Sequence, residues 1–75
     1  MKNFDDLLVL LAEIGVPKEV LHEADGSWQL RNDLALSSAE TVALQVLLKS
    51  RYGYEFFLWG EHDYSLDELA RGNGN

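Results

Sequence analysis

The sequence predicts an all-α fold, a small bundle of three main helices and one short helix. Two segments, residues 3–14 and 38–52, carry apolar side chains at the spacing of an amphipathic helix. Two Ser-x-x-Glu patterns, which begin at Ser37 and Ser65, are typical of helix N-termini. The run YEFFLW at residues 54–59 resembles a strand, but a single strand has no partner to pair with.

The first helix is expected over residues 3–14. Asn3 is the expected N-cap, and two acidic residues follow it in the first turn, where the helix dipole favours negative charge. Gly15 and Pro17 are typical of a helix end. The apolar stripe of this helix consists of Phe4, Leu7, Leu8, Leu11 and Ile14.

The segment between the two long helices is predicted to be mostly loop. Residues 17–24 have room for one or two helical turns, whereas residues 24–36 are rich in turn-forming residues. We expect this long loop to be ordered, since a loop of such length with anchoring apolar residues is often functional. The expected anchors are Trp28, Leu30, Leu34 and Leu36.

The long helix is expected to begin at the double serine and to run to Tyr52, with Gly53 as its stop. Residues 54–59 then form an extended connection that leads to a short helical turn near residues 60–63. One stripe of the long helix consists of Val42, Ala43, Val46, Leu47 and Ser50, and beside it lie Leu44, Leu48 and Arg51.

The last helix is short and opens at Ser65, with Glu68 completing the capping pattern and Arg71 suiting its C-terminus. It contains Leu66, Leu69 and Ala70. The chain is expected to form a single helical domain over residues 1–71, followed by a flexible tail at residues 72–75.

The charge of the chain excludes some classes of partner. Its 75 residues include 13 acidic and 6 basic side chains, for a formal charge of −7. Such a chain has little means to neutralise the phosphates of a nucleic acid or of an anionic membrane. It is steered instead toward basic protein surfaces, although solubility alone is the simpler explanation of the charge.

The absence of cysteine excludes disulfides, thiolate catalysis and cysteine-ligated metals. The N-terminal apolar run is short and carries acidic residues, so it is neither a signal peptide nor a membrane span. The cytoplasm is the expected compartment.

The two adjacent serines are expected to have different roles. Ser37 suits the N-cap, with its hydroxyl bonded to the Glu40 amide and the Glu40 carboxylate bonded to the Ser37 amide. Ser38 occupies the first helical position, where no cap is needed and the side chain points outward. An anion attached to Ser38 would be stabilised by free amides and by the helix dipole.

Residues 33–44, DLALSSAETVAL, resemble the acyl carrier protein signature D-L-G-L-D-S-L-[DE]-x-V-x-L. In that family the signature serine bears 4′-phosphopantetheine, and an ungapped alignment puts Ser38 in its place. The matching positions are Asp33, Leu34, Leu36, Glu40, Val42 and Leu44. The segments 11–17, 51–56 and 65–69 resemble further parts of the family in the same order, so the resemblance covers nearly the whole chain and implies the family's fold.

Several positions depart from the signature. Ser37 replaces the usual Asp, Ala39 the usual Leu or Ile, and Ala35 the usual Gly, and Glu40 is the one acidic residue left on the long helix. These changes argue against a housekeeping carrier of fatty-acid synthesis. They favour a specialised, free-standing carrier of a dedicated biosynthetic pathway.

The resemblance implies a carrier and not an enzyme. Ser38 would hold thioester-bound acyl or aminoacyl intermediates on covalent 4′-phosphopantetheine. The implied partners of a monomeric carrier are a phosphopantetheinyl transferase and the acyl-transferring and acyl-processing enzymes. We expect them to dock on Glu40, Val42 and Val46. Two alternatives stay open: a carrier-like module that acts by protein contact without a prosthetic group, and an unrelated acidic helical protein that blocks a basic surface.

Other chemistry finds weak support. The two histidines, His22 and His62, lack the tight spacing of metal ligands, so no metal site is predicted. A triad of Ser38, His62 and Asp63 can be assembled on paper, but no nucleophile elbow or oxyanion element accompanies it.

Overall fold

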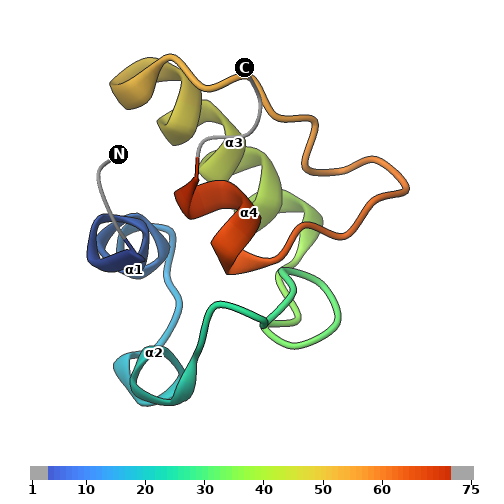
Figure 1. The fold of residues 1–75 in the computed structure, drawn as a ribbon. Coiled ribbons are helices and arrows are strands. Elements are labelled where there is room, and N and C mark those ends of the chain that lie inside the picture. The colour runs from blue at the N-terminus through green and yellow to red at the C-terminus, as the bar shows by residue number, and fades with distance from the viewer. Residues whose placement is uncertain (1–3, 72–75) are drawn as a thin grey trace.

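The computed structural model describes residues 4–71, which form four helices (Figure 1). The helices are α1 (Phe4–Glu13), α2 (Lys18–Glu23), α3 (Ser38–Tyr52) and α4 (Leu66–Ala70). The all-α prediction is confirmed, since the described residues pair as β-structure only in one isolated bridge, between Gln29 and Ser65. The expected Asn3 cap and the expected tail at residues 72–75 lie outside the described residues. None of the helices within residues 4–71 has the length and apolar character that crossing a bilayer requires.

Helix α1 is the element against which the other three helices pack. It contacts α2, α3 and α4, and its side chains Leu7, Leu10 and Leu11 are almost completely buried. Figure 1 shows α1 nearly end-on, with α4 in the middle of the molecule and α3 running behind it. The opposite side of α1 faces solvent, where the Val9 side chain is 58% exposed.

Both ends of α3 have the predicted capping geometry. The Ser37 hydroxyl accepts from the Glu40 amide at 3.1 Å, and a carboxylate oxygen of Glu40 accepts from the Ser37 amide at 2.9 Å. At the other end, Gly53 has a left-handed conformation (φ +72°) and its amide donates to the Lys49 carbonyl at 2.9 Å. The predicted start and stop of the long helix are therefore confirmed.

The face of α3 that enters the core is the row of Thr41, Leu44 and Leu48, all fully buried. The buried Thr41 hydroxyl has a hydrogen-bond partner, since it donates to the Ser37 carbonyl at 2.8 Å. The neighbouring row is largely open to solvent, with Val42 48% and Val46 58% exposed. Contact with α1 therefore selects one of two apolar rows that the sequence placed side by side.

The connection from α3 to α4 contains no helix, so the predicted helical turn near residues 60–63 is wrong. The chain instead reverses between Phe57 and Gly60, where the Gly60 amide donates to the Phe57 carbonyl at 3.3 Å. After Gly60 the connection is bonded to the loop at residues 24–36, because the Asp63 carboxylate accepts hydrogen bonds from two backbone amides of that loop.

Helix α4 begins with the predicted capping box. The Ser65 hydroxyl accepts from the Glu68 amide at 3.3 Å, and a Glu68 carboxylate oxygen accepts from the Ser65 amide at 3.0 Å. The Ser65 amide, and after it the His62 ring, lower the pKa of the Glu68 carboxyl. The cap directs the buried side chains Leu66 and Leu69 into the core.

An ion pair connects the ends of α1 and α3. The Arg51 guanidinium donates to both carboxylate oxygens of Glu13, with one nitrogen–oxygen distance of 2.9 Å. This hydrogen-bonded contact lowers the pKa of Glu13. Because both side chains are exposed, the pair contributes little to the stability of the fold.

Ala35 has a left-handed backbone conformation, with φ at +54°. The Cβ atom makes this region unfavourable for residues other than glycine, at a cost of about 1 kcal/mol. The conformation lets the chain turn back, so that Leu36 is buried and its amide donates to the Leu30 carbonyl at 3.0 Å. This left-handed conformation explains why the carrier signature has glycine at the position that Ala35 occupies.

We predict that Ala35→Gly raises the free energy of unfolding by about 1 kcal/mol, since removal of the Cβ relieves the left-handed strain. Ala43→Gly, in the middle of α3, is the matched control and should lower it by about 1 kcal/mol through lost helix propensity. Urea denaturation measures both. Equal destabilisation by the two substitutions would contradict the strain at Ala35.

The capping geometry also predicts different costs for the two serines. Ser37→Ala should lower the free energy of unfolding by about 1 kcal/mol, because it removes the hydroxyl that accepts from the Glu40 amide. Ser38→Ala removes an exposed hydroxyl and should cost under about 0.5 kcal/mol. Chemical denaturation of both variants decides between them, and a larger loss from Ser38→Ala would refute the assignment of Ser37 as the cap.

Candidate functional site

The loop at residues 24–36 leads directly into the double serine, and it is bonded to the start of α4. The Leu30 amide donates to the Tyr64 carbonyl at 3.0 Å, and the Leu66 amide donates to the Trp28 carbonyl at 2.9 Å. In Figure 1 this loop and the connection that precedes α4 approach one another below α4. The loop is therefore ordered, as the sequence predicts, although it contains no helix.

The loop is also closed by bonds within itself. A carboxylate oxygen of Asp33 accepts from the Gln29 amide at 2.8 Å, and the Leu36 amide reaches back to the Leu30 carbonyl. Leu30 and Leu36 are buried in the core, and two other predicted anchors, Trp28 and Leu34, pack against it while partly exposed. The predicted anchoring of the loop is confirmed.

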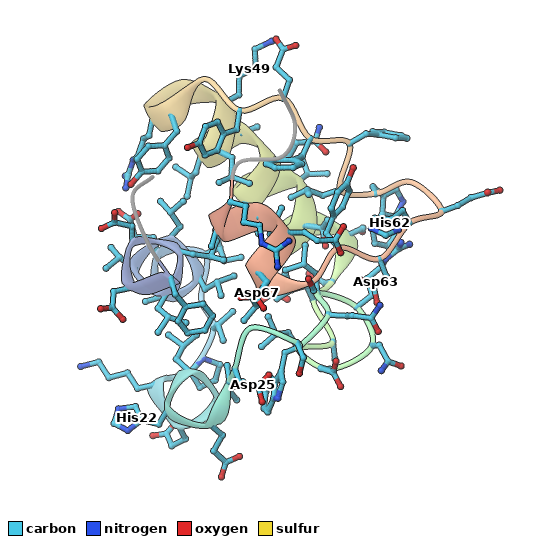
Figure 2. All side chains as sticks on the ribbon, in the orientation of Figure 1. His22, Asp25, Lys49, His62, Asp63 and Asp67 are labelled. Atoms are coloured by element: carbon cyan, nitrogen blue, oxygen red, sulfur yellow. The ribbon has the colours of Figure 1, made fainter. Side chains whose placement is uncertain are left out.

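Asp63 holds the loop from outside. Its carboxylate oxygens accept from the amides of Arg31 and Asn32, each at 2.9 Å. The Arg31 Nε lies 3.7 Å from the same carboxylate. The Arg31 guanidinium also lies over the Trp59 ring, with its Cζ 5.6 Å from the ring centroid. Figure 2 shows Asp63 beside the loop. Sequence reasoning missed this role, because Asp63 and the amides that it binds are more than 30 residues apart.

Ser38 is the first residue of α3, and its side chain is exposed. Its hydroxyl takes part in no hydrogen bond among residues 4–71, and within the same residues the amides of Ser38 and Ala39 have no acceptor. These amides are the positive end of the α3 dipole. An accessible hydroxyl beside unsatisfied donors is chemically suited to bear an anionic group through a phosphodiester.

The three predicted docking residues differ in their availability. Val42 and Val46 lie outside the core on one side of α3, where their side chains are 48% and 58% exposed. Glu40 is half-buried and its carboxylate already serves the helix cap. Two of the three side chains are thus free for contact with a partner, whereas the third has a structural role.

A groove of about 350 Å³ adjoins Val46 on the surface between α3 and the following connection. The Gln45 side chain holds this connection in place by accepting from the Leu58 amide at 2.9 Å, and Phe57 stays 69% exposed at the groove. The Lys49 ammonium lies 3.0 Å from the Glu55 carboxylate. The groove is lined by Gln45, Val46, Lys49, Tyr54, Glu55, Phe56 and Phe57.

The two histidines lie in different surroundings. His22 is exposed on α2 (Figure 2), whereas the His62 ring nitrogen lies 2.8 Å from a carboxylate oxygen of Glu68. Among the described residues no group of three or more ligating side chains could hold a metal ion. His62 is thus paired with Glu68, and Asp63 with the loop, rather than with one another.

Of the comparisons with known proteins, the one with solved structures is informative. No model of a known protein family and no curated protein matches the chain. Among solved structures, the chain is similar to ColA1a, a type II peptidyl carrier protein of collismycin biosynthesis. The two share 40% sequence identity and superpose with a TM-score of 0.86, and the match covers 93% of this chain and 89% of that chain.

This match agrees with the resemblance carried by residues 33–44. The shared fold extends over the capped helix that Ser38 begins and over the loop before it, since nearly the whole of each chain is covered. With sequence identity and fold in agreement along that length, the chain belongs to the carrier protein family.

Proposed function

We propose that this protein carries acyl or aminoacyl intermediates as thioesters on 4′-phosphopantetheine attached to Ser38, in a specialised biosynthetic pathway. The observation that supports this most strongly is the exposed Ser38 hydroxyl at the positive end of α3, within a carrier fold. The resemblance of residues 33–44 to the carrier signature leads to the same serine. Carrier proteins are not enzymes, so the chemistry belongs to the partners.

The chain's own contribution is to hold the attachment point. When bound, the prosthetic group supplies the thiol that bears the cargo, which this cysteine-free chain does not have. The free amides of Ser38 and Ala39 stabilise the negative charge of a phosphodiester by about 0.3–1 kcal/mol. Ser37 keeps the helix end in place and leaves the Ser38 oxygen in solvent.

For the cargo, we favour an aminoacyl or peptidyl unit over a fatty acyl chain. The structurally similar ColA1a is a peptidyl carrier protein of a natural-product pathway. The departures from the signature at Ala35, Ser37 and Ala39 also favour a dedicated pathway over fatty-acid synthesis. The proposed partners are a phosphopantetheinyl transferase and the enzymes that load and process the cargo in the cytoplasm.

We propose that these enzymes dock on the exposed row of α3. Val42 and Val46 are bare apolar side chains on the helix that Ser38 begins, and Phe57 extends this surface across the groove. Burial of apolar surface is the dominant favourable term in most protein–protein association, while net charge mainly speeds association. The acidic chain therefore approaches a basic partner and holds it by apolar contact.

The carrier function predicts covalent modification of one serine. Incubation with coenzyme A and a broad-specificity phosphopantetheinyl transferase should add one phosphopantetheinyl group, located on Ser38 by peptide mapping and intact mass. Ser38→Ala should stay folded and unmodified, whereas Ser37→Ala, the adjacent control, should still be modified. A group on Ser37 would refute the assignment of the attachment to Ser38, and a wild-type protein that no tested transferase modifies would favour the module without a prosthetic group.

The docking surface predicts which substitution weakens binding to a cognate enzyme. Val46→Asp places a charge in the apolar contact and should raise Kd about tenfold, mostly through faster release. Glu40→Gln should have a smaller effect, since glutamine preserves the helix cap. Binding kinetics at two salt concentrations measure both effects.

Val9→Asp is the matched control for Val46→Asp. The Val9 side chain is exposed to the same 58% but lies on α1, away from the proposed surface. It should change Kd little. A larger loss from Glu40→Gln than from Val46→Asp, or an equal loss from Val9→Asp, would refute the apolar docking surface.

A further inference from the structure

We propose that Asp63 is a positioning residue for the modification of Ser38, because its carboxylate holds the loop at residues 29–36 in the conformation that presents Ser38 to the transferase. This inference rests on the proposed function, since it concerns the same serine. Asp63 lies on the connection before α4, outside the segment that resembles the carrier signature.

The contacts of Asp63 are those of a clamp on backbone atoms. One carboxylate oxygen accepts from the Arg31 amide and the other from the Asn32 amide, both at 2.9 Å. The side chain is 20% exposed, so these bonds are partly shielded from water. The Gln29 side-chain amide adds a third contact by donating to the Asp63 carbonyl at 3.1 Å.

The clamp is connected to Ser38 through the closed loop. Residues 31 and 32 lie between Leu30 and Leu36, which are joined by the bond from the Leu36 amide to the Leu30 carbonyl. Ser37 follows at once and begins the capping box of α3. Fixing the two amides therefore fixes the path by which the chain enters the helix.

The strain at Ala35 favours opening of the loop, and the bonds to Asp63 oppose it. A left-handed alanine persists only where its surroundings hold it, and it would relax if the loop opened. Asp63 is one of the groups that hold the loop closed, together with the buried side chains of Leu30 and Leu36. Without the clamp, the loop should sample open conformations while α3 and its cap persist.

A transferase that binds an open loop must order it first, and this ordering weakens binding. The bound loop then has the native conformation, so the chemical step is unaffected. Loss of the clamp should therefore raise KM for the carrier and leave kcat unchanged. A side chain that only stabilised the fold would shift the melting temperature without moving KM at a temperature where the variant is folded.

The test measures kcat and KM for phosphopantetheinyl transfer from coenzyme A to the unmodified protein, with a broad-specificity transferase. Asp63→Asn places a donor against one of the two amides and should raise KM about tenfold, the effect of losing one hydrogen bond to a charged group. Asp63→Glu keeps the charge but moves the carboxylate by one methylene, so it should raise KM less. Asp63→Glu carries the test if Asp63→Asn fails to fold.

Two controls separate the clamp from other effects of the same groups. Glu61→Gln removes the same charge from an exposed position two residues away and should leave KM unchanged. Arg31→Ala removes the guanidinium near Asp63 but keeps the backbone amide, so it should have little effect. Unchanged KM in both Asp63 variants, a fall in kcat alone, or an equal rise in Glu61→Gln would overturn the proposal.

Amide hydrogen exchange supplies a readout that does not depend on the transferase. In Asp63→Asn, exchange should speed up at Asn32 and Leu36 but not at Leu44 in α3. Uniform acceleration, or none at the loop, would overturn the clamp. If the wild-type protein is never modified while the loop of Asp63→Asn still opens selectively, the proposed function fails, and with it the role of Asp63 in modification, whereas the clamp on the loop is confirmed.

Discussion

The bonding of the loop at residues 24–36 to the start of α4 is the constraint on which the site depends. The loop lacks helix and strand, so its backbone groups are not paired by regular structure. Besides the bonds within the loop, its backbone bonds to the Tyr64 carbonyl, the Leu66 amide and the Asp63 carboxylate. The same bonds therefore set the entry into α3 and the beginning of α4, two helices that otherwise meet α1 independently.

The core is built mostly from leucine, and several other apolar residues stay exposed. Each of the four helices contributes at least one buried leucine, and the loops add Leu30, Leu36 and Leu58. In a chain this short the core is small, so most apolar side chains are needed to stabilise it. Val42 and Val46 lie one turn apart on α3, with Phe57 across the groove from Val46, and the proposed docking surface gives a reason for exposed apolar side chains grouped in this way.

The geometry of α3 relates attachment to docking. Val42 and Val46 follow Ser38 by four and eight residues, which places them roughly 6 and 12 Å further along the helix axis. An enzyme that contacts the N-terminus of α3 can thus meet both valines without any movement of the carrier. The groove beside Val46 extends this surface toward the connection, whose position depends on the bond from the Leu58 amide to Gln45.

The sequence by itself determined the features that rest on neighbours in the chain. The caps at Ser37 and Ser65 and the stop at Gly53 involve residues three to five positions apart, and the signature around Ser38 is continuous. Only the tertiary structure decided which row of α3 is buried, why residues 60–63 are not helical, and what Asp63 binds. These outcomes depend on contacts between distant segments, such as Asp63 with Asn32, and local periodicity carries no information about which distant amide will lie within reach of a carboxylate.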